Sequence, residues 1–304
     1  MPSDNHQPFH GILPALITPL DDQGRFLPAA LERLLARLYA ANIQGVYVCG
    51  QTGEGMAQPA AQRIEVLETA IRCTPPGKTV IAHVGAASQA EAITLARHAA
   101  KAGAHAISSL PPFGLHSFAE IRAWYEALAR SSELPLLIYY FPDAFPVLAN
   151  TAQVLELAAL PNVIGLKFTD FDLYKMWCIK QTGKLVYNGR DEVLAAGLLM
   201  GADGGIGTFY NLVPDWFADL YRFARAGDWA AARAVQDDIN ELLHMALQFP
   251  MLAAVKKILA WMGLDCGVPL APRRPLTGEQ EQRLLKLLAP TRFGRTKIAD
   301  AAVS

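Results

Sequence analysis

Residues 162–170 read Asn-Val-Ile-Gly-Leu-Lys-Phe-Thr-Asp, an apolar run with a single basic residue, Lys167. A strand that is hydrophobic nearly throughout is typical of a parallel sheet buried on both faces. Burial of a lysine near the end of such a strand lowers its pKa from the usual value of about 10.4. Two interpretations of this segment stay open. Lys167 could be a neutral amine that forms a Schiff base with a carbonyl, or it could extend to a carboxylate such as Asp170.

Seven further apolar runs recur along the chain at intervals of roughly 20 to 35 residues. The eight predicted strands are 12–18, 45–50, 79–85, 105–110, 135–141, 163–169, 184–188 and 204–208. Amphipathic helices are predicted between them over 28–41, 58–73, 88–102, 118–131 and 151–160. Repeated strand-helix units imply a parallel sheet, and eight units over about 220 residues favour a closed (β/α)8 TIM barrel over an open doubly wound sheet.

After Asn211 the pattern becomes helical only, with amphipathic helices predicted over 216–225, 229–249, 251–261 and 278–288. We therefore expect a barrel with the active site over residues 8–226 and a C-terminal helical extension packed on it over residues 227–290. Residues 291–304 have little apolar periodicity and are expected to form a loose tail.

Composition excludes several classes of function. The formal net charge of the 304-residue chain is -1 and its basic residues are scattered, so neither nucleic acid nor an anionic membrane is an expected partner. The four cysteines lie far apart without a C-x-x-C pair, which argues against a disulfide framework and a structural zinc site. No export signal and no apolar stretch of about 18 residues is present, so we expect a cytoplasmic protein with a small-molecule substrate.

Barrel geometry places Lys167 where active sites of this fold lie, at the C-terminal end of a strand. Because side chains alternate along a strand, Lys167 and Thr169 share a face that can point into the barrel. The preceding strand supplies Tyr139 at a comparable height, and its phenol could pass a proton when the amine attacks a ketone. A packing role with a satisfied hydroxyl is the alternative for this tyrosine.

Two loops could hold polar groups of a substrate. Residues 50–55, Gly-Gln-Thr-Gly-Glu-Gly, could bind a carboxylate through backbone amides and hydroxyls, but they lack the phosphate-loop pattern. The loop 188–192 places Asp191 and Glu192 at the end of the seventh strand, where they could accept hydrogen bonds from sugar hydroxyls or simply favour a helix N-terminus. Residues 201–207 follow no strand that would make them a dinucleotide fingerprint. The histidines show no paired ligand spacing, so no metal is expected.

Taken together, the motifs resemble one family. They are Gly50-x-Thr52-Gly53-Glu54, Tyr139, Gly165-Leu166-Lys167, Tyr187-Asn188-Gly189-x-Asp191-Glu192 and Gly201-Ala202-Asp203-Gly204-Gly205-Ile206-Gly207. Their order and spacing, from about Gly11 to about Pro290, are similar to the pyruvate-dependent class I aldolases, the superfamily of N-acetylneuraminate lyase and dihydrodipicolinate synthase. The resemblance implies that Lys167 forms the Schiff base, that Tyr139 relays protons, and that Thr52 holds the carboxylate and joins the relay. It also implies a homotetramer without a cofactor.

Within the superfamily the chain is more similar to N-acetylneuraminate lyases. Dihydrodipicolinate synthases typically carry an arginine five residues after the strand-five tyrosine, and here that residue is Ala144. The resemblance implies that the sugar acid's tail is bound by Thr169, Gly189, Asp191, Glu192 and Thr208, with Gln51, Gly53, Arg190 and Gly207 also at the substrate. The implied reaction is cleavage of N-acetylneuraminate to pyruvate and N-acetylmannosamine.

Three departures from the family pattern leave alternatives open. Gln51 stands where a serine or threonine usually joins Thr52, and residues 114–115, Gly-Leu, stand where many members place a relay tyrosine. Arg190 could contact a substrate carboxylate or neutralise the two acids that follow it. The alternatives are an aldolase or dehydratase of another 2-keto-3-deoxy sugar acid, then a dihydrodipicolinate synthase-like condensation, and outside enzymes a 2-keto acid binding protein.

Overall fold

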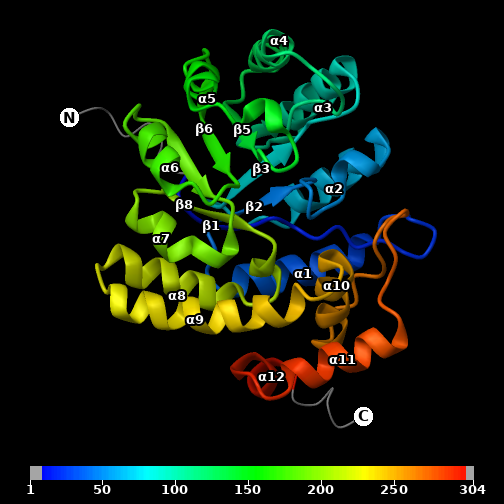
Figure 1. Cartoon of the computed structure of the whole chain (residues 1–304). Helices are drawn as coiled ribbons and strands as arrows, with labels where there is room; N and C mark the ends of the chain where they lie inside the picture. The colour runs from blue at the N-terminus through cyan, green and yellow to red at the C-terminus, as the bar shows by residue number, and fades with distance from the viewer. Residues whose placement is uncertain (1–8, 299–304) are drawn as a thin grey trace.

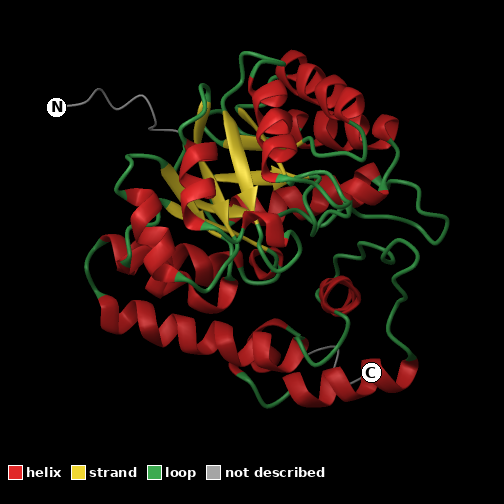
Figure 2. Ribbon diagram, turned by 45° about the horizontal axis from the view of Figure 1, so that its top comes forward, coloured by secondary structure: helices red, strands yellow, loops and turns green. Residues whose placement is uncertain are grey.

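The computed structural model describes residues 9–298, and its eight parallel strands form a barrel (Figures 1 and 2). The strands are β1 (Gly11–Pro14), β2 (Gly45–Val48), β3 (Thr79–His83), β4 (Ala106–Ser109), β5 (Leu136–Tyr140), β6 (Val163–Phe168), β7 (Leu185–Asn188) and β8 (Gly204–Gly207). Each strand pairs with its sequence neighbour from β2 to β8, and β8 pairs with β1. The barrel closes between the end of β1 and β2. A parallel bridge joins Ala15 to Tyr47, and Leu16 N donates to Tyr47 O at 2.9 Å. The predicted (β/α)8 barrel is confirmed.

Helices surround the strands in regular alternation, as Figure 2 shows. They are α1 (Pro28–Ala40), α2 (Ala60–Arg72), α3 (Gln89–Ala102), α4 (Phe118–Ala129), α5 (Thr151–Ala158), α6 (Leu173–Lys180), α7 (Leu194–Leu199) and α8 (Pro214–Arg225). Capping side chains mark several starts, among them the capping box of Ser117 and Glu120 at α4. Short 3-10 turns follow the ends of four strands: η1 (Gly55–Ala57), η2 (Pro146–Leu148), η3 (Asp191–Val193) and η4 (Phe209–Asn211).

The C-terminal helices pack on one side of the barrel (Figure 1). They are α9 (Trp229–Ala246), α10 (Met251–Trp261), α11 (Gly278–Leu288) and α12 (Arg292–Lys297), with α9 running along α8. No single helix within residues 9–298 has the length and apolarity of a membrane span. The pair α9 and α10, which is bent by 111°, has that length and apolarity only when the two helices are taken together.

The prediction of a loose tail from residue 291 is wrong for α12. Thr291 caps this helix by accepting a bond from Gly294 N at 3.0 Å, and Phe293 is buried with its ring edge-on to Trp216. An aromatic side chain, a cap and the ion pairs of Arg292 with Asp238 and of Lys297 with Asp215 hold the segment. None of them produces the apolar periodicity by which longer helices are recognised. Residues 299–304 of the predicted tail lie outside the described part of the chain.

Candidate active site

Lys167 lies near the C-terminal end of β6 and points into the barrel, as the alternation predicted. The strand register pairs it with Tyr139 on β5 and Tyr187 on β7. Its Nζ lies 4.0 Å from the centre of the Tyr139 ring and 4.5 Å from that of Tyr47 on β2, and the residue is only 3% exposed. Lys167 is therefore surrounded by aromatic faces rather than by carboxylates.

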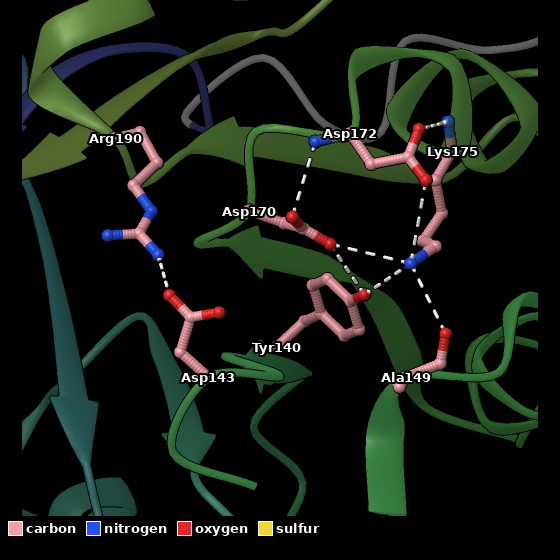
Figure 3. Close-up of polar contacts among 7 residues, drawn as sticks. All are labelled: Tyr140, Asp143, Ala149, Asp170, Asp172, Lys175 and Arg190. Carbon is pink, nitrogen blue, oxygen red and sulfur yellow. Dashed lines mark hydrogen bonds and ion pairs between the residues drawn. The ribbon is translucent and has the colours of Figure 1, made fainter. Parts of the chain in front are cut away.

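The alternative pairing of Lys167 with Asp170 is not what the structure contains. Asp170 accepts a 2.9 Å bond from the Tyr140 hydroxyl and pairs at 3.4 Å with Nζ of Lys175, outside the barrel interior (Figure 3). Burial lowers the pKa of Lys167 to about 7, while attraction to Asp191 partly opposes that shift. A large fraction of the amine is therefore neutral near pH 7, as a nucleophile requires.

The floor of the site is a layer of neutral polar groups beneath the amine. Tyr47 donates to Ser108 Oγ at 2.9 Å, and His83 Nε2 accepts a bond from Leu110 N at 3.1 Å. Burial holds the pKa of His83 well below its usual value, so its ring is uncharged. Tyr139 meets both the Tyr47 and His83 rings edge-on at 6.0 Å, and burial raises the pKa of its phenol, which stays protonated and can donate. None of Tyr47, His83 and Ser108 was predicted from the sequence as a site residue.

The turn after β2 is tied to the end of β8. Thr52 and Thr208 share a 2.6 Å hydrogen bond between their hydroxyls, and both line the cavity. Gly53 does not line it. Its carbonyl instead accepts bonds from Thr18 Oγ1 at 2.7 Å and Gln58 Nε2 at 2.6 Å, which fix the turn.

Glu54 connects the same turn to the C-terminal extension. Its side chain has no exposed area and accepts a bond from Leu270 N at 2.9 Å. It pairs at 3.4 Å with Lys256 of α10, which is also buried, and at 3.4 Å with Arg273. The helices that follow the barrel therefore support the turn that carries Thr52.

Two glycines of the cavity wall, one after β7 and one at the end of β8, leave room for side-chain oxygen atoms of neighbouring residues. A Cβ on Gly189 would lie 2.2 Å from Thr169 Oγ1, and a Cβ on Gly207 would lie 1.8 Å from Asp191 Oδ1. The Thr169 hydroxyl is buried and has no hydrogen-bond partner within residues 9–298. Asp191 lies in the first turn of η3 and accepts a 2.8 Å bond from Phe209 N, and burial raises its pKa to about 7.

The loop that carries the acids is held from behind by α9. Gln236 donates to the carbonyl of Asp191 at 3.0 Å, and Asn240 donates to that of Glu192 at 3.1 Å. Arg190 forms an ion pair with Asp143, across the loops that follow β7 and β5 (Figure 3). Arg190 therefore forms its ion pair with Asp143 rather than with Asp191 or Glu192.

The cavity at Lys167 has a volume of about 150 Å³. Every predicted site residue except Gly53 lines it, together with Phe141, Ile206 and Phe209 and with Leu243, Leu247 and Met251 from the C-terminal helices. In the described part of the chain, no three His, Cys, Asp or Glu side chains are grouped as a metal ion would require. The cavity thus combines a buried amine, a phenol, threonine hydroxyls and two carboxyl groups.

Comparison with known proteins identifies similar chains. The model of the dihydrodipicolinate synthetase family matches residues 8–290. N-acetylneuraminate lyase 2 of Escherichia coli O6:H1 is 36% identical over 272 residues, which cover 87% of this chain and 89% of the relative. N-acetylneuraminate lyase of Rhizobium meliloti is 36% identical over 289 residues, with 92% and 94% covered. The structure of Ruminococcus gnavus sialic acid aldolase superposes with a TM-score of 0.89 at 28% identity, over 96% of this chain and 99% of that one.

Proposed function

Because the chain belongs to the dihydrodipicolinate synthetase family, we propose that it cleaves N-acetylneuraminate to pyruvate and N-acetylmannosamine through a Schiff base on Lys167. The enzyme is an aldehyde-lyase, as its relatives are. The observation that carries the Schiff-base step is the position of Lys167 Nζ, buried in the cavity at 4.0 Å from the Tyr139 ring with its pKa lowered to about 7.

The first steps join the substrate to the enzyme. The Thr52 hydroxyl holds the carboxylate of an open-chain 2-keto acid and fixes the adjacent ketone next to the amine. Neutral Nζ attacks the ketone carbon, the Tyr139 phenol passes protons to and from the departing oxygen, and water leaves. The product is a protonated imine, which draws electrons from the neighbouring carbon atoms.

Cleavage then breaks the bond between carbons three and four. The hydroxyl on carbon four loses its proton and becomes the aldehyde, while the bonding electron pair moves to carbon three and neutralises the imine as an enamine. Protonation of carbon three and addition of water release pyruvate and restore the amine. Thr169, Asp191 and Glu192 line the wall at which the hydroxyls of the aldehyde half would be held.

The choice of N-acetylneuraminate rests on the names of the relatives and on that polar wall. The test is pyruvate release from N-acetylneuraminate by the wild type and by Lys167→Ala, together with borohydride trapping of pyruvate on each. Turnover and trapping that both disappear in the variant support the proposal. Trapping without turnover of N-acetylneuraminate rejects this substrate, and a wild type that is not trapped rejects the Schiff base.

We also propose that the enzyme acts as a cytoplasmic homotetramer without a cofactor. Exposed apolar side chains, with Leu115 at 104% and Tyr174 at 70%, supply surfaces that subunits could bury, and all four cysteines are free. Light scattering coupled to size-exclusion chromatography tests the assembly. A monomer at micromolar concentration would reject it.

A further inference from the structure

We propose that Arg190 binds a second anionic group at the far end of the substrate, so that the enzyme also cleaves 2-keto-3-deoxy sugar acids that carry a terminal carboxylate or phosphate. This inference rests on the proposed Schiff-base chemistry and extends its substrate class. It concerns the guanidinium of Arg190, to which a neutral sugar tail would bring no opposite charge.

Arg190 lines the same cavity as the amine and lies in the loop directly after β7, next to Gly189 and Asp191. From Lys167 Nζ, the Tyr139 ring is 4.0 Å away, Phe141 stacks on Tyr139 at 6.2 Å, and the guanidinium carbon of Arg190 lies 5.5 Å from the Phe141 ring. Arg190 and Thr52 are both lining residues. A substrate whose carboxylate is held at Thr52 and whose ketone is at Lys167 would therefore share this cavity with the guanidinium, which its far end could reach.

The guanidinium is oriented but incompletely bonded. It is placed between the rings of Phe141 and Phe171, at 5.5 and 4.5 Å, and its terminal nitrogen Nη2 donates to Asp143. Its Nε is buried and has no hydrogen-bond acceptor within residues 9–298. A buried donor without an acceptor is unfavourable, and an arginine presents its donors as a fork that matches a carboxylate or phosphate.

Asp143 is a partner that a ligand can replace. Its side chain is 67% exposed, against 18% for Arg190. An ion pair with one exposed member contributes little stability, and Asp143 can return to water without losing much solvation. An incoming anion would take over its bond and supply an acceptor for Nε as well.

The loop that carries Asp143 is anchored independently of the ion pair. Lys175 donates to the Tyr140 hydroxyl at 2.9 Å and to the carbonyl of Ala149 at 3.2 Å, on either side of Asp143 in the sequence, and pairs with Asp170 (Figure 3). Displacing the Asp143 carboxylate from Arg190 would therefore leave the loop in place.

The arginines around the hollow outside the cavity would attract an anionic substrate. Outside the cavity lies a wider hollow of about 480 Å³, lined by Gln51, Phe141 and Met251 and by two arginines, Arg273 and Arg274. Several acids oppose this attraction, because Asp143 already pairs with Arg190 and Glu54 with Arg273. Glu192 lines the cavity, and Asp191 is only partly charged near pH 7 because burial raises its pKa to about 7. The directed hydrogen bonds of the Arg190 guanidinium therefore decide the preference for an anionic over a neutral substrate.

The experiment compares three substrates that differ only at carbon six: 2-keto-3-deoxygluconate, its 6-phosphate, and 2-keto-3-deoxyglucarate. For the wild type, kcat/KM should be about 10- to 100-fold higher for at least one of the two anionic substrates than for the neutral one. Arg190→Met should remove this preference by lowering kcat/KM about 10- to 100-fold more for the anionic substrates than for the neutral one. Asp143→Asn should increase it, because the competing carboxylate is gone.

A matched control is Arg222→Met on α8, because Arg222 also pairs with an aspartate, at 2.9 Å, and also stacks on a phenylalanine, at 4.2 Å, but is remote from the cavity. It should keep the wild-type preference. Equal losses on all three substrates in Arg190→Met would show that the arginine only holds the loops, and that overturns the inference. Failure to cleave either anionic substrate, while pyruvate is still trapped on Lys167, overturns it too without affecting the Schiff base. A wild type that is not trapped would instead reject the proposed function.

Discussion

Replacing Lys167 by methionine should abolish activity and make the protein more stable. Lys167 is buried among aromatic rings, and burial lowers its pKa from 10.5 to about 7. The folded chain must therefore either hold an unfavourable buried charge or release a proton that the unfolded chain keeps. Methionine has a similar unbranched side chain and carries no charge, so the variant escapes this penalty.

The size of the gain depends on pH in a defined way. Between pH 7 and pH 10.5 the unfolded chain binds one more proton at this residue than the folded chain, so this lysine makes wild-type stability rise with pH across that window. Each pKa unit corresponds to about 1.4 kcal/mol. The advantage of Lys167→Met should be ~5 kcal/mol below pH 7, ~3 kcal/mol at pH 8 and ~1 kcal/mol at pH 9.5.

Urea unfolding of both proteins at pH 7, 8 and 9.5 measures this difference. The matched control is Lys256→Met, which also removes a buried lysine but leaves the fully buried Glu54 without its 3.4 Å partner on α10. That change should destabilise the protein by about 3–5 kcal/mol. An unchanged or lower stability of Lys167→Met at pH 7, or a gain that does not shrink towards pH 10, would refute the account of Lys167 as an unpaired buried amine.

Three further predictions concern the site. Tyr139→Phe should lower kcat by about 10²- to 10⁴-fold by removing the proton relay, without a change in the circular dichroism spectrum; a kcat within threefold of wild type would contradict that role. Gly207→Ala should raise KM for the sugar acid and leave pyruvate trapping intact, because the new Cβ would lie 1.8 Å from Asp191 Oδ1; unchanged KM would mean that Asp191 does not contact the substrate. The rate of borohydride trapping should rise with pH through a midpoint of about 7, and Asp191→Asn should lower this midpoint, because Asp191 raises the Lys167 pKa; a midpoint near 10 would show that the amine is not perturbed.

The barrel was predictable because apolar runs mark its strands one by one. The structure ends most strands one to four residues earlier than predicted, as in β1, which ends at Pro14 rather than Thr18. The apolar runs continue past the last ladder bonds into the loops that form the site. Helices α6 and α7 were missed, because α6 exposes Tyr174 and Trp177 instead of showing an apolar stripe and α7 is only 6 residues long.

The site was predictable where strand alternation decides which way a side chain points, as for Lys167 and Tyr139. It was not predictable where distant segments meet. The ion pair of Arg190 with Asp143 joins residues 47 positions apart in the sequence, and Met251 reaches the cavity only because α10 folds back onto the barrel. Neither contact produces a local pattern, since each depends on how the loops and the C-terminal helices are placed.

Three lysines among residues 9–298 are nearly fully buried, and their surroundings assign them different roles. Lys256 faces Glu54, and Lys175 faces Asp170 and the Tyr140 hydroxyl, so each of these ammonium groups has an acidic partner that compensates for lost water. Lys167 has the faces of Tyr47 and Tyr139 instead and, within residues 9–298, no ion pair. Burial lowers the pKa of both Lys256 and Lys167, but the Glu54 carboxylate opposes this shift at Lys256. The pKa of Lys167 falls to about 7, so its amine can lose a proton near neutral pH and attack a carbonyl. The absence of an acidic partner within contact distance, more than burial itself, is what distinguishes the proposed nucleophile from the two structural lysines.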